Sequence, residues 1–134
     1  MDDEEKLRVS ALMLYFAEGT KKGRNVDFTN SNILMVKIWL KFLKKICKVD
    51  VKRIKFQLHL HYDMDEEDIR KWWSKNLNVP QENFTKSYIK KVKKKGTYKA
   101  KSEIGTIKVR YSSKSLLDNI NNQIGTVAQN LTSR

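Results

Sequence analysis

The chain has 134 residues, the size of one ordinary domain, and 40% of them are hydrophobic, which is enough for a single packed core. Its 28 Lys and Arg residues against 15 Asp and Glu residues give a formal net charge of +13, which favours a polyanionic partner such as nucleic acid. The N-terminus is acidic, no apolar run approaches the roughly 20 residues of a membrane span, and Cys47 is the only cysteine, which together exclude a signal peptide, a transmembrane helix, an internal disulfide and a CxxC zinc site. We therefore expect one domain over residues 1–134, an intracellular location in the cytoplasm or nucleoid, and no membrane partner.

The first segment, residues 4–17, contains closely spaced apolar residues and no helix breaker, which predicts a helix that ends at Gly19. Its second half is apolar on more than one side, so it must be covered on more than one side, either by its own core or by a second copy of the chain. Residues 25–29 are expected to form a short strand. The Asn and Ser residues at 30–32 suit the N-cap of a following helix.

Residues 33–48 predict an amphipathic helix with a lysine stripe. At about 100° per residue, the stripe gathers within about 100° of arc, and it consists of Lys37, Lys41, Lys44, Lys45 and Lys48. Two interpretations stay open: an ordinary solvated helix face, which we favour, and a surface that contacts phosphates. Cys47 lies with the apolar side and is interpreted as a small core residue.

Residues 53–62 alternate strictly between apolar and polar side chains, which predicts a half-buried strand. The polar side chains are of the types that reach base edges and phosphates, and they belong to Arg53, Lys55, Gln57, His59 and His61. His59 and His61 could instead hold a metal ion. Because no third ligand lies nearby in the sequence, the exposed polar face is the preferred interpretation.

The second half of the chain is expected to add a helix over 66–77, a long antiparallel hairpin of 84–92 with 105–112, and a closing helix from Ser113. Acids at the start of the 66–77 helix suit its dipole, which explains them without a cation site. The elements predict an α+β fold, with one mixed or antiparallel sheet and helices on one face. Nucleic acid would contact the other face and the basic loops, through Arg24, Arg53, Lys55, Gln57, His59, His61, Lys91, Lys93, Lys94, Lys108 and Arg110.

Several segments resemble the LAGLIDADG homing endonucleases, which places the expected fold in a LAGLIDADG-like class. Residues 11–19, with the sequence ALMLYFAEG, resemble the signature helix of that family and match it at Leu14, Ala17, Glu18 and Gly19. Residues 28–31 resemble the strand beside the active site, 38–46 the helix that follows, and 109–117 the last strand with the start of the closing helix.

The resemblance implies a homing-type DNA endonuclease that depends on Mg²⁺ or Mn²⁺. Glu18 would be the metal ligand, Asn30 would hold a metal-bound water, and Lys114 or Lys108 would complete the catalytic site. The metal ion would polarise the scissile phosphate and lower the pKa of an attacking water. A single signature implies a homodimer through the helix around residues 7–19, where Ala11 and Ala17 allow close approach, acting on near-palindromic double-stranded DNA.

The chain also departs from the family pattern. The first long hairpin of the family is reduced to the residues between Gly19 and Asn30, and a helix with Trp72 and Trp73 is inserted, so base contacts would shift to 53–61 and 84–112. Two other classes stay open. One is a non-catalytic LAGLIDADG-like DNA- or RNA-binding regulator or splicing factor, and the other is a ribosomal-type RNA-binding domain, which predicts no metal dependence.

Overall fold

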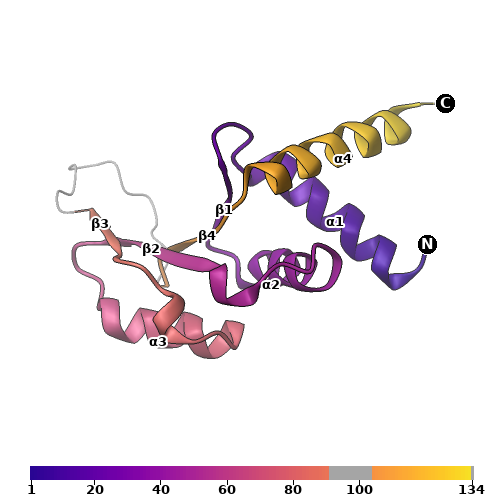
Figure 1. Cartoon of the computed structure of the whole chain (residues 1–134). Coiled ribbons are helices and arrows are strands. Elements are labelled where there is room, and N and C mark those ends of the chain that lie inside the picture. The colour runs from indigo at the N-terminus through magenta and orange to yellow at the C-terminus, as the bar shows by residue number, and fades with distance from the viewer. Residues whose placement is uncertain (91–103, 134) are drawn as a thin grey trace.

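The computed structural model describes residues 1–90 and 104–133, which form four α-helices and one four-stranded sheet (Figure 1). The predicted α+β class is confirmed. The helices are α1 (Asp3–Glu18), α2 (Ile33–Lys41), α3 (Glu66–Leu77) and α4 (Lys114–Thr132), and the strands are β1 (Asn25–Asn30), β2 (Lys55–His61), β3 (Tyr88–Lys90) and β4 (Thr106–Ser112). The helix expected over 33–48 is shorter as an α-helix, because α2 continues as a π-helical segment over Phe42–Ile46.

The sheet is mixed, with the strand order β1-β4-β2-β3. β4 is antiparallel to both β1 and β2, whereas β3 is parallel to β2. The predicted antiparallel hairpin of 84–92 with 105–112 is therefore wrong. β4 has Ile107 and Val109 fully buried and occupies a central position, while all three residues of β3 are exposed, as suits a short edge strand. Lys91, Lys93 and Lys94 of the expected hairpin tip lie outside the described residues.

One face of the sheet packs on the helices, as predicted. Side chains alternate along β2 and β4, so that Phe56, Leu58, Ile107 and Val109 are buried while their neighbours in sequence reach the other face. In the middle of this core, the ring of Trp39 stacks on those of Tyr15 and Phe28, with centroids 4.9 and 5.4 Å apart. α1, β1 and α2 therefore meet at one aromatic cluster.

α1 and α4 lie side by side and run in opposite directions, with both chain termini at the same end of the molecule (Figure 1). The closing helix expected from Ser113 is confirmed as α4, in which Leu117, Ile120, Ile124 and Val127 are buried, whereas Leu131, near its C-terminal end, is 64% exposed. No helix in the described part of the chain combines the length and the apolar character needed to cross a bilayer.

Local capping follows the sequence at two helix starts. The Asn32 side chain accepts hydrogen bonds from the Leu34 and Met35 amides at 2.9 and 3.2 Å, which confirms the predicted N-cap of α2. At α3, the Asp65 side chain accepts from the Asp68 amide at 3.0 Å, and the acids that follow occupy the first turn.

The two adjacent tryptophans of α3 lie in different environments, and Cys47 packs against the core as expected. Trp73 is fully buried and donates from Nε1 to the Ile104 carbonyl at 2.7 Å, while Trp72 packs edge-on against it nearer the surface. Burial raises the pKa of the Cys47 thiol to about 11, as expected for a cysteine that packs against the core.

Candidate nucleic-acid interface

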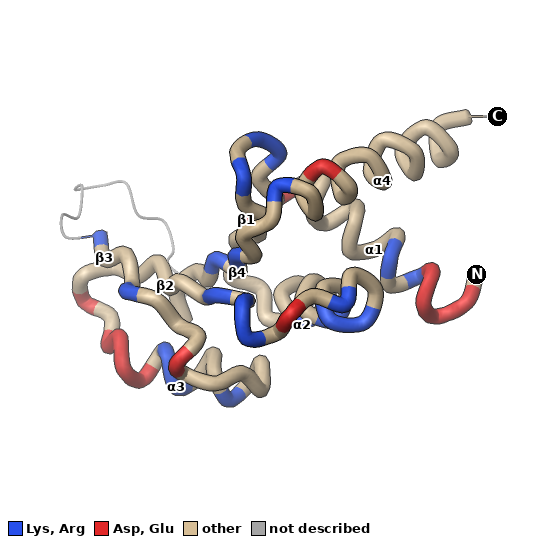
Figure 2. The backbone as a smooth tube through the Cα atoms, in the orientation of Figure 1, with Lys and Arg blue, Asp and Glu red and all other residues tan. Residues whose placement is uncertain are grey.

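The face of the sheet that the helices leave open carries polar side chains in rows, because strand register aligns them. In one row Lys55 of β2 is paired with Arg110 of β4, and Arg110 with Asp27 of β1. The next row, two residues along, contains Gln57, Lys108 and Thr29. In Figure 2 the Lys and Arg positions of β2 and β4 lie together near the centre of the molecule. We call these two rows the basic rows.

Arg110 is held by an ion pair within the first basic row. Its Nε and Nη2 atoms each donate to an Asp27 carboxylate oxygen at 2.8 Å, which is a bidentate arrangement. The hydrogen bond to Asp27 raises the pKa of Arg110. Asp27 is only 8% exposed and is the one carboxylate in the basic rows, so its charge is neutralised within the protein. The net positive charge of the rows comes from Lys55 and Lys108.

Gln57 and His59 on β2 are held by a chain of hydrogen bonds. The Gln57 amide donates to the Lys86 carbonyl at 3.0 Å, and its Oε1 lies 3.3 Å from His59 Nε2. Burial lowers the pKa of His59, and the nearby charge of Lys108 lowers it further. The imidazole is therefore neutral at pH 7, so His59 adds hydrogen-bonding and stacking capacity rather than charge.

Arg53 does not lie on the open strand, because β2 begins at Lys55 and Arg53 closes a 3₁₀ turn before it. Its guanidinium stacks 4.7 Å from the ring centre of Tyr111 and donates to the Ser112 carbonyl at 2.8 Å. Arg53 thus stabilises the C-terminal end of β4 through a cation–π contact and a hydrogen bond. Arg24 is exposed in the turn before β1, and His61 ends β2 opposite Lys90.

The first two candidate catalytic residues lie near each other along the backbone. Gly19 forms an isolated bridge with Phe28, and the Thr20 amide donates to the Asp27 carbonyl at 3.0 Å, so α1 ends against the outer edge of β1. Glu18 directly precedes this bridge and is exposed, and Asn30 lies two residues beyond it. Asn30 Oδ1 already accepts the Asn32 amide at 2.8 Å. Among the described residues, no three His, Cys, Asp or Glu side chains gather where they could hold a metal ion.

The two candidate catalytic lysines lie at different ends of β1. Lys108 is paired with Thr29, the neighbour of Asn30. Lys114 follows Ser112, which is paired with Asn25, five residues and roughly 16 Å along the strand from Asn30. The Lys114 ammonium also forms an ion pair with Asp118 at 3.0 Å. By register, Lys108 is the lysine nearer to Asn30 along the sheet, but the two side chains belong to opposite faces, because Asn30 is paired with the buried Ile107.

Gly19 ends α1 for a steric reason. The helix ends at Gly19 as predicted, and the φ of −90° at this residue is accessible to any amino acid, so no left-handed conformation requires a glycine here. A Cβ atom at this position would overlap the ring of Tyr15. The Tyr15 hydroxyl in turn donates to the Thr20 carbonyl and accepts the Asp27 amide at 3.2 Å, and burial raises its pKa to about 12. The sequence analysis did not predict this hydrogen bond between Tyr15 and the Asp27 amide. The one sequence feature that pointed to Asp27 is its position as an acid between two apolar residues of β1.

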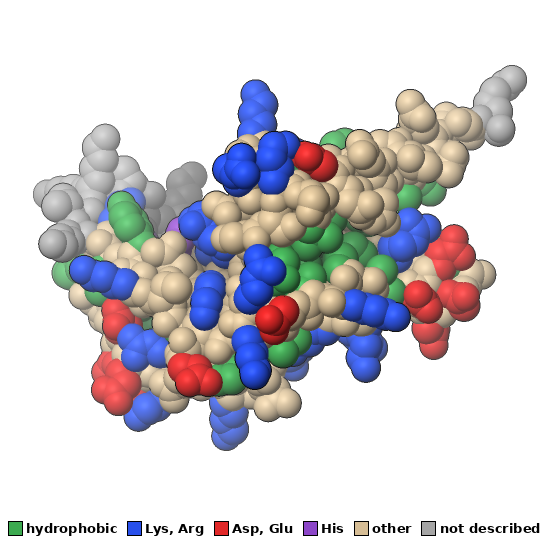
Figure 3. Space-filling view, viewed as in Figure 1, with side chains coloured by type: hydrophobic (Ala, Val, Ile, Leu, Met, Phe, Trp, Pro, Cys, Tyr) green, Lys and Arg blue, Asp and Glu red, His purple; other side chains and the backbone are tan. Residues whose placement is uncertain are grey.

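The expected dimer surface on α1 is only partly available. Ala11 is fully buried in the core of its own chain, which corrects its expected place at a dimer interface. Ala17 is exposed, and so is half of the Phe16 side chain. Figure 3 shows hydrophobic side chains at the surface in a patch between the α1–α4 pair and α2. This patch is the part of the helical layer that a second chain could cover.

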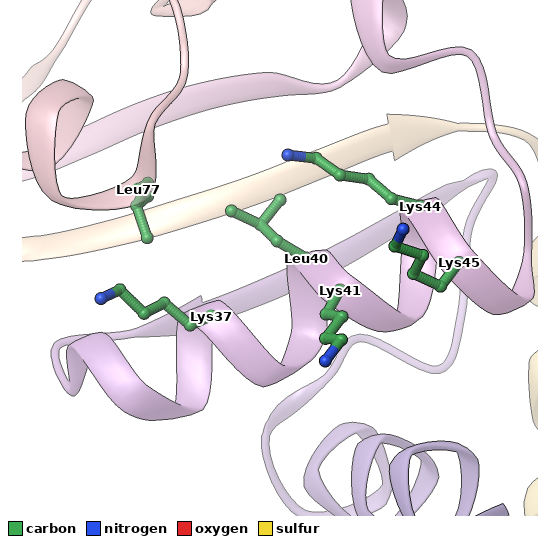
Figure 4. Close-up of a pocket in the computed structure, with 6 residues that line it drawn as sticks. All are labelled: Lys37, Leu40, Lys41, Lys44, Lys45 and Leu77. Atoms are coloured by element: carbon green, nitrogen blue, oxygen red, sulfur yellow. The ribbon is translucent and has the colours of Figure 1, made fainter. Parts of the chain in front are cut away.

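The lysine stripe lies on the outer side of the helical layer. Lys37, Lys41, Lys44 and Lys45 surround a surface hollow whose apolar lining is Leu40 and Leu77. In Figure 4 the four ammonium groups diverge around this hollow and do not converge on one point. None of them forms an ion pair with another described residue. This arrangement favours the interpretation as a solvated helix face.

No protein-family model, no curated protein and no solved structure gives a significant match to this chain.

Proposed function

We propose that the protein binds double-stranded DNA across the open face of its sheet. The observation that carries this proposal is the pair of basic rows. Lys55 and Lys108 form no ion pair with any described residue, and each is paired with a residue whose guanidinium or amide group is already fixed in place. Lysine supplies phosphate contacts, and glutamine and arginine side chains are able to read base edges. The only carboxylate of the rows is neutralised by Arg110, so it does not repel a phosphate backbone.

The salt dependence of binding tests this function. Each phosphate contact releases counterions, so the logarithm of the affinity for a duplex is expected to fall with the logarithm of the salt concentration, with a slope of about −0.9 per contact. The measurement is fluorescence anisotropy of a labelled duplex over a series of salt concentrations. An affinity that does not change with salt, or a preference for single-stranded RNA over every duplex, would contradict the proposal.

A second candidate function is metal-dependent cleavage of the bound DNA, as the LAGLIDADG resemblance suggests. The observation in its favour is the position of Glu18 at the end of α1. Gly19, the next residue, forms a bridge with Phe28 of β1, and Phe28 precedes Thr29, which is paired with Lys108. Mg²⁺ is bound through one or two carboxylates together with water and phosphate oxygens, which one exposed Glu18 from each chain of a homodimer would satisfy. The metal ion would activate a water for attack on the phosphate, while Lys108 would stabilise charge on the phosphate.

The variant Glu18→Gln tests cleavage separately from binding. It keeps the size of the side chain and removes its charge, so nicking of the duplex in Mg²⁺ or Mn²⁺ is expected to vanish while affinity for the duplex is kept. The control is Glu82→Gln, which changes an exposed acid in the 3₁₀ turn Gln81–Asn83, away from α1. If the wild-type protein binds a duplex and never nicks it, the cleavage function is wrong while the binding function stands.

The homodimer belongs to this second candidate, because one chain supplies only one carboxylate at this position. Burial of Phe16 and of the hydrophobic patch beside α1 would stabilise such a dimer. Light scattering is expected to give the mass of two chains, and Ala17→Trp is expected to shift it toward one chain by overpacking the contact. A monomeric wild-type protein would contradict this arrangement.

A further inference from the structure

A third row on the open face, next to the basic rows, is aromatic. His59 of β2 is paired with Thr106 of β4 on one side and with Tyr88 of β3 on the other. The His59 and Tyr88 rings contact each other, with centroids 5.8 Å apart and planes inclined by 57°. Because His59 follows Gln57 by two residues, this row lies about 7 Å along the sheet from the row that contains Lys108.

Tyr88 leaves much of its ring in solvent. Its side chain is 62% exposed on the edge strand β3, although a tyrosine ring is a large apolar surface. His59 is kept in place beside it by the hydrogen-bonded Gln57. The pair therefore offers an ordered and accessible aromatic surface, held on a strand rather than on a loop.

Nucleobases stack on such surfaces in a way that depends little on sequence, since every base has a π-face. Inside a duplex the faces of each base are already covered by its neighbours. An aromatic ring beside the phosphate contacts can therefore stack only on a base that is unpaired, at an end, a gap or a displaced strand.

We propose that Tyr88 and His59 form a stacking site for an unpaired nucleobase that extends from the duplex bound on the basic rows. This inference rests on the proposed DNA-binding function and names the substrate class of the same face, namely duplex DNA with a single-stranded extension. The phosphate backbone contacts Lys108, and the first unpaired base beyond the duplex lies on the Tyr88 ring.

The test compares a blunt duplex with the same duplex carrying a short single-stranded extension. Tyr88→Ala is expected to weaken binding of the extended DNA by about tenfold, the ordinary effect of removing one base–aromatic stack. Tyr88→Phe keeps the ring and is expected to bind like the wild type. Tyr62→Ala is the matched control, because Tyr62 is similarly exposed, at 53%, and lies beyond the end of β2. None of the three variants is expected to change binding of the blunt duplex.

A second measurement uses the unaltered protein. A fluorescent purine analogue in the extension is expected to be quenched on binding, because stacking on an aromatic ring quenches it. If its fluorescence does not change, or if Tyr88→Ala and Tyr62→Ala bind the extended DNA equally, the stacking site is wrong while duplex binding stands. If the wild type binds neither DNA, the proposed function fails, and the stacking site fails with it.

Discussion

Two basic surfaces formed by the described residues differ in how their polar groups are held. On the open sheet face, the bidentate ion pair fixes Arg110 and a main-chain carbonyl fixes Gln57, so only Lys55 and Lys108 remain to be ordered by a ligand. On α2 and the π-helical segment, the four lysines around the hollow diverge (Figure 4) and form no ion pair with any other described residue.

This difference matters because ordering a long side chain costs conformational entropy. Lysine is among the side chains with the largest such cost, and a ligand that must order four divergent lysines loses much of the electrostatic gain. A surface that is already ordered by its own hydrogen bonds loses less. Both surfaces contribute to the net charge of +13, so net charge alone does not distinguish a binding surface from a solvated helix face.

The largest expected difference between the surfaces is in DNA affinity. The double variant Lys55→Gln, Lys108→Gln removes two phosphate contacts, so the slope of log affinity against log salt is expected to become shallower by about 1.8. Lys41→Gln with Lys45→Gln removes the same charge from the lysine stripe and is expected to leave the slope unchanged. Equal changes in the two double variants, measured by anisotropy, would place the DNA on both surfaces or on neither.

The next largest expected difference is in stability. Arg110→Met leaves the Asp27 carboxylate, which is only 8% exposed, without its partner, and is expected to lower the free energy of unfolding by about 2 kcal/mol. Lys45→Met removes a charge that forms no ion pair within the described part of the chain, and is expected to change the free energy of unfolding by less than about 0.5 kcal/mol. Urea denaturation measures both.

Adding Asp27→Asn to Arg110→Met provides the control for this prediction. The second change removes the unpaired charge, so it is expected to restore part of the lost stability. If the double variant is less stable than Arg110→Met, the loss comes from packing of the arginine and not from the buried carboxylate.

Periodic elements could be predicted from the sequence because their pattern repeats within one segment. The alternation along 53–62 located β2, and the apolar spacing after Ser113 located α4. The first residue of β2 was placed two residues too early, which put Arg53 on the open face. No period marks the end of a strand, and the stacking of Arg53 on Tyr111 depends on a neighbouring strand.

Strand pairing and the ion pair could not be predicted, because both depend on register between distant segments. Asp27 and Arg110 are 83 residues apart and meet only because β4 lies beside β1. The hairpin prediction took neighbours in sequence to be neighbours in the sheet, whereas the buried residues of β4 require a central position and separate it from β3. Of the candidate catalytic residues, Glu18 and Asn30 were expected together, and the choice between Lys108 and Lys114 needed the register.

The smallest expected effect is on the pKa of His59, and it separates the contribution of burial to that pKa from the contribution of the Lys108 charge. Burial is the main cause that lowers the pKa of His59, and the positive charge of Lys108 is the second. Lys108→Gln is therefore expected to raise the pKa of His59, measured by NMR titration, and to leave it still below its ordinary value of about 6.5. Lys41→Gln, on the other surface, is expected to leave this pKa unchanged, and a rise of equal size in both variants would mean that net charge acts at long range.

The sign of the accompanying effect on stability follows from the same direction of shift. The unfolded chain takes up a proton at His59 at a higher pH than the folded protein does, so the unfolded state gains protons first as the pH falls. The contribution of His59 to the free energy of unfolding is then fully present above about pH 6.5. It is lost as the pH falls through 6.5 toward the lower pKa of His59 in the folded protein. Lys108→Gln narrows this interval, so its stability is expected to depend less on pH between 5 and 7 than that of the wild type, with urea denaturation at each pH as the measurement. A steeper dependence of stability on pH in the variant would mean that Lys108 stabilises the charged imidazole. That would contradict the repulsion expected between two positive charges in adjacent rows of the sheet.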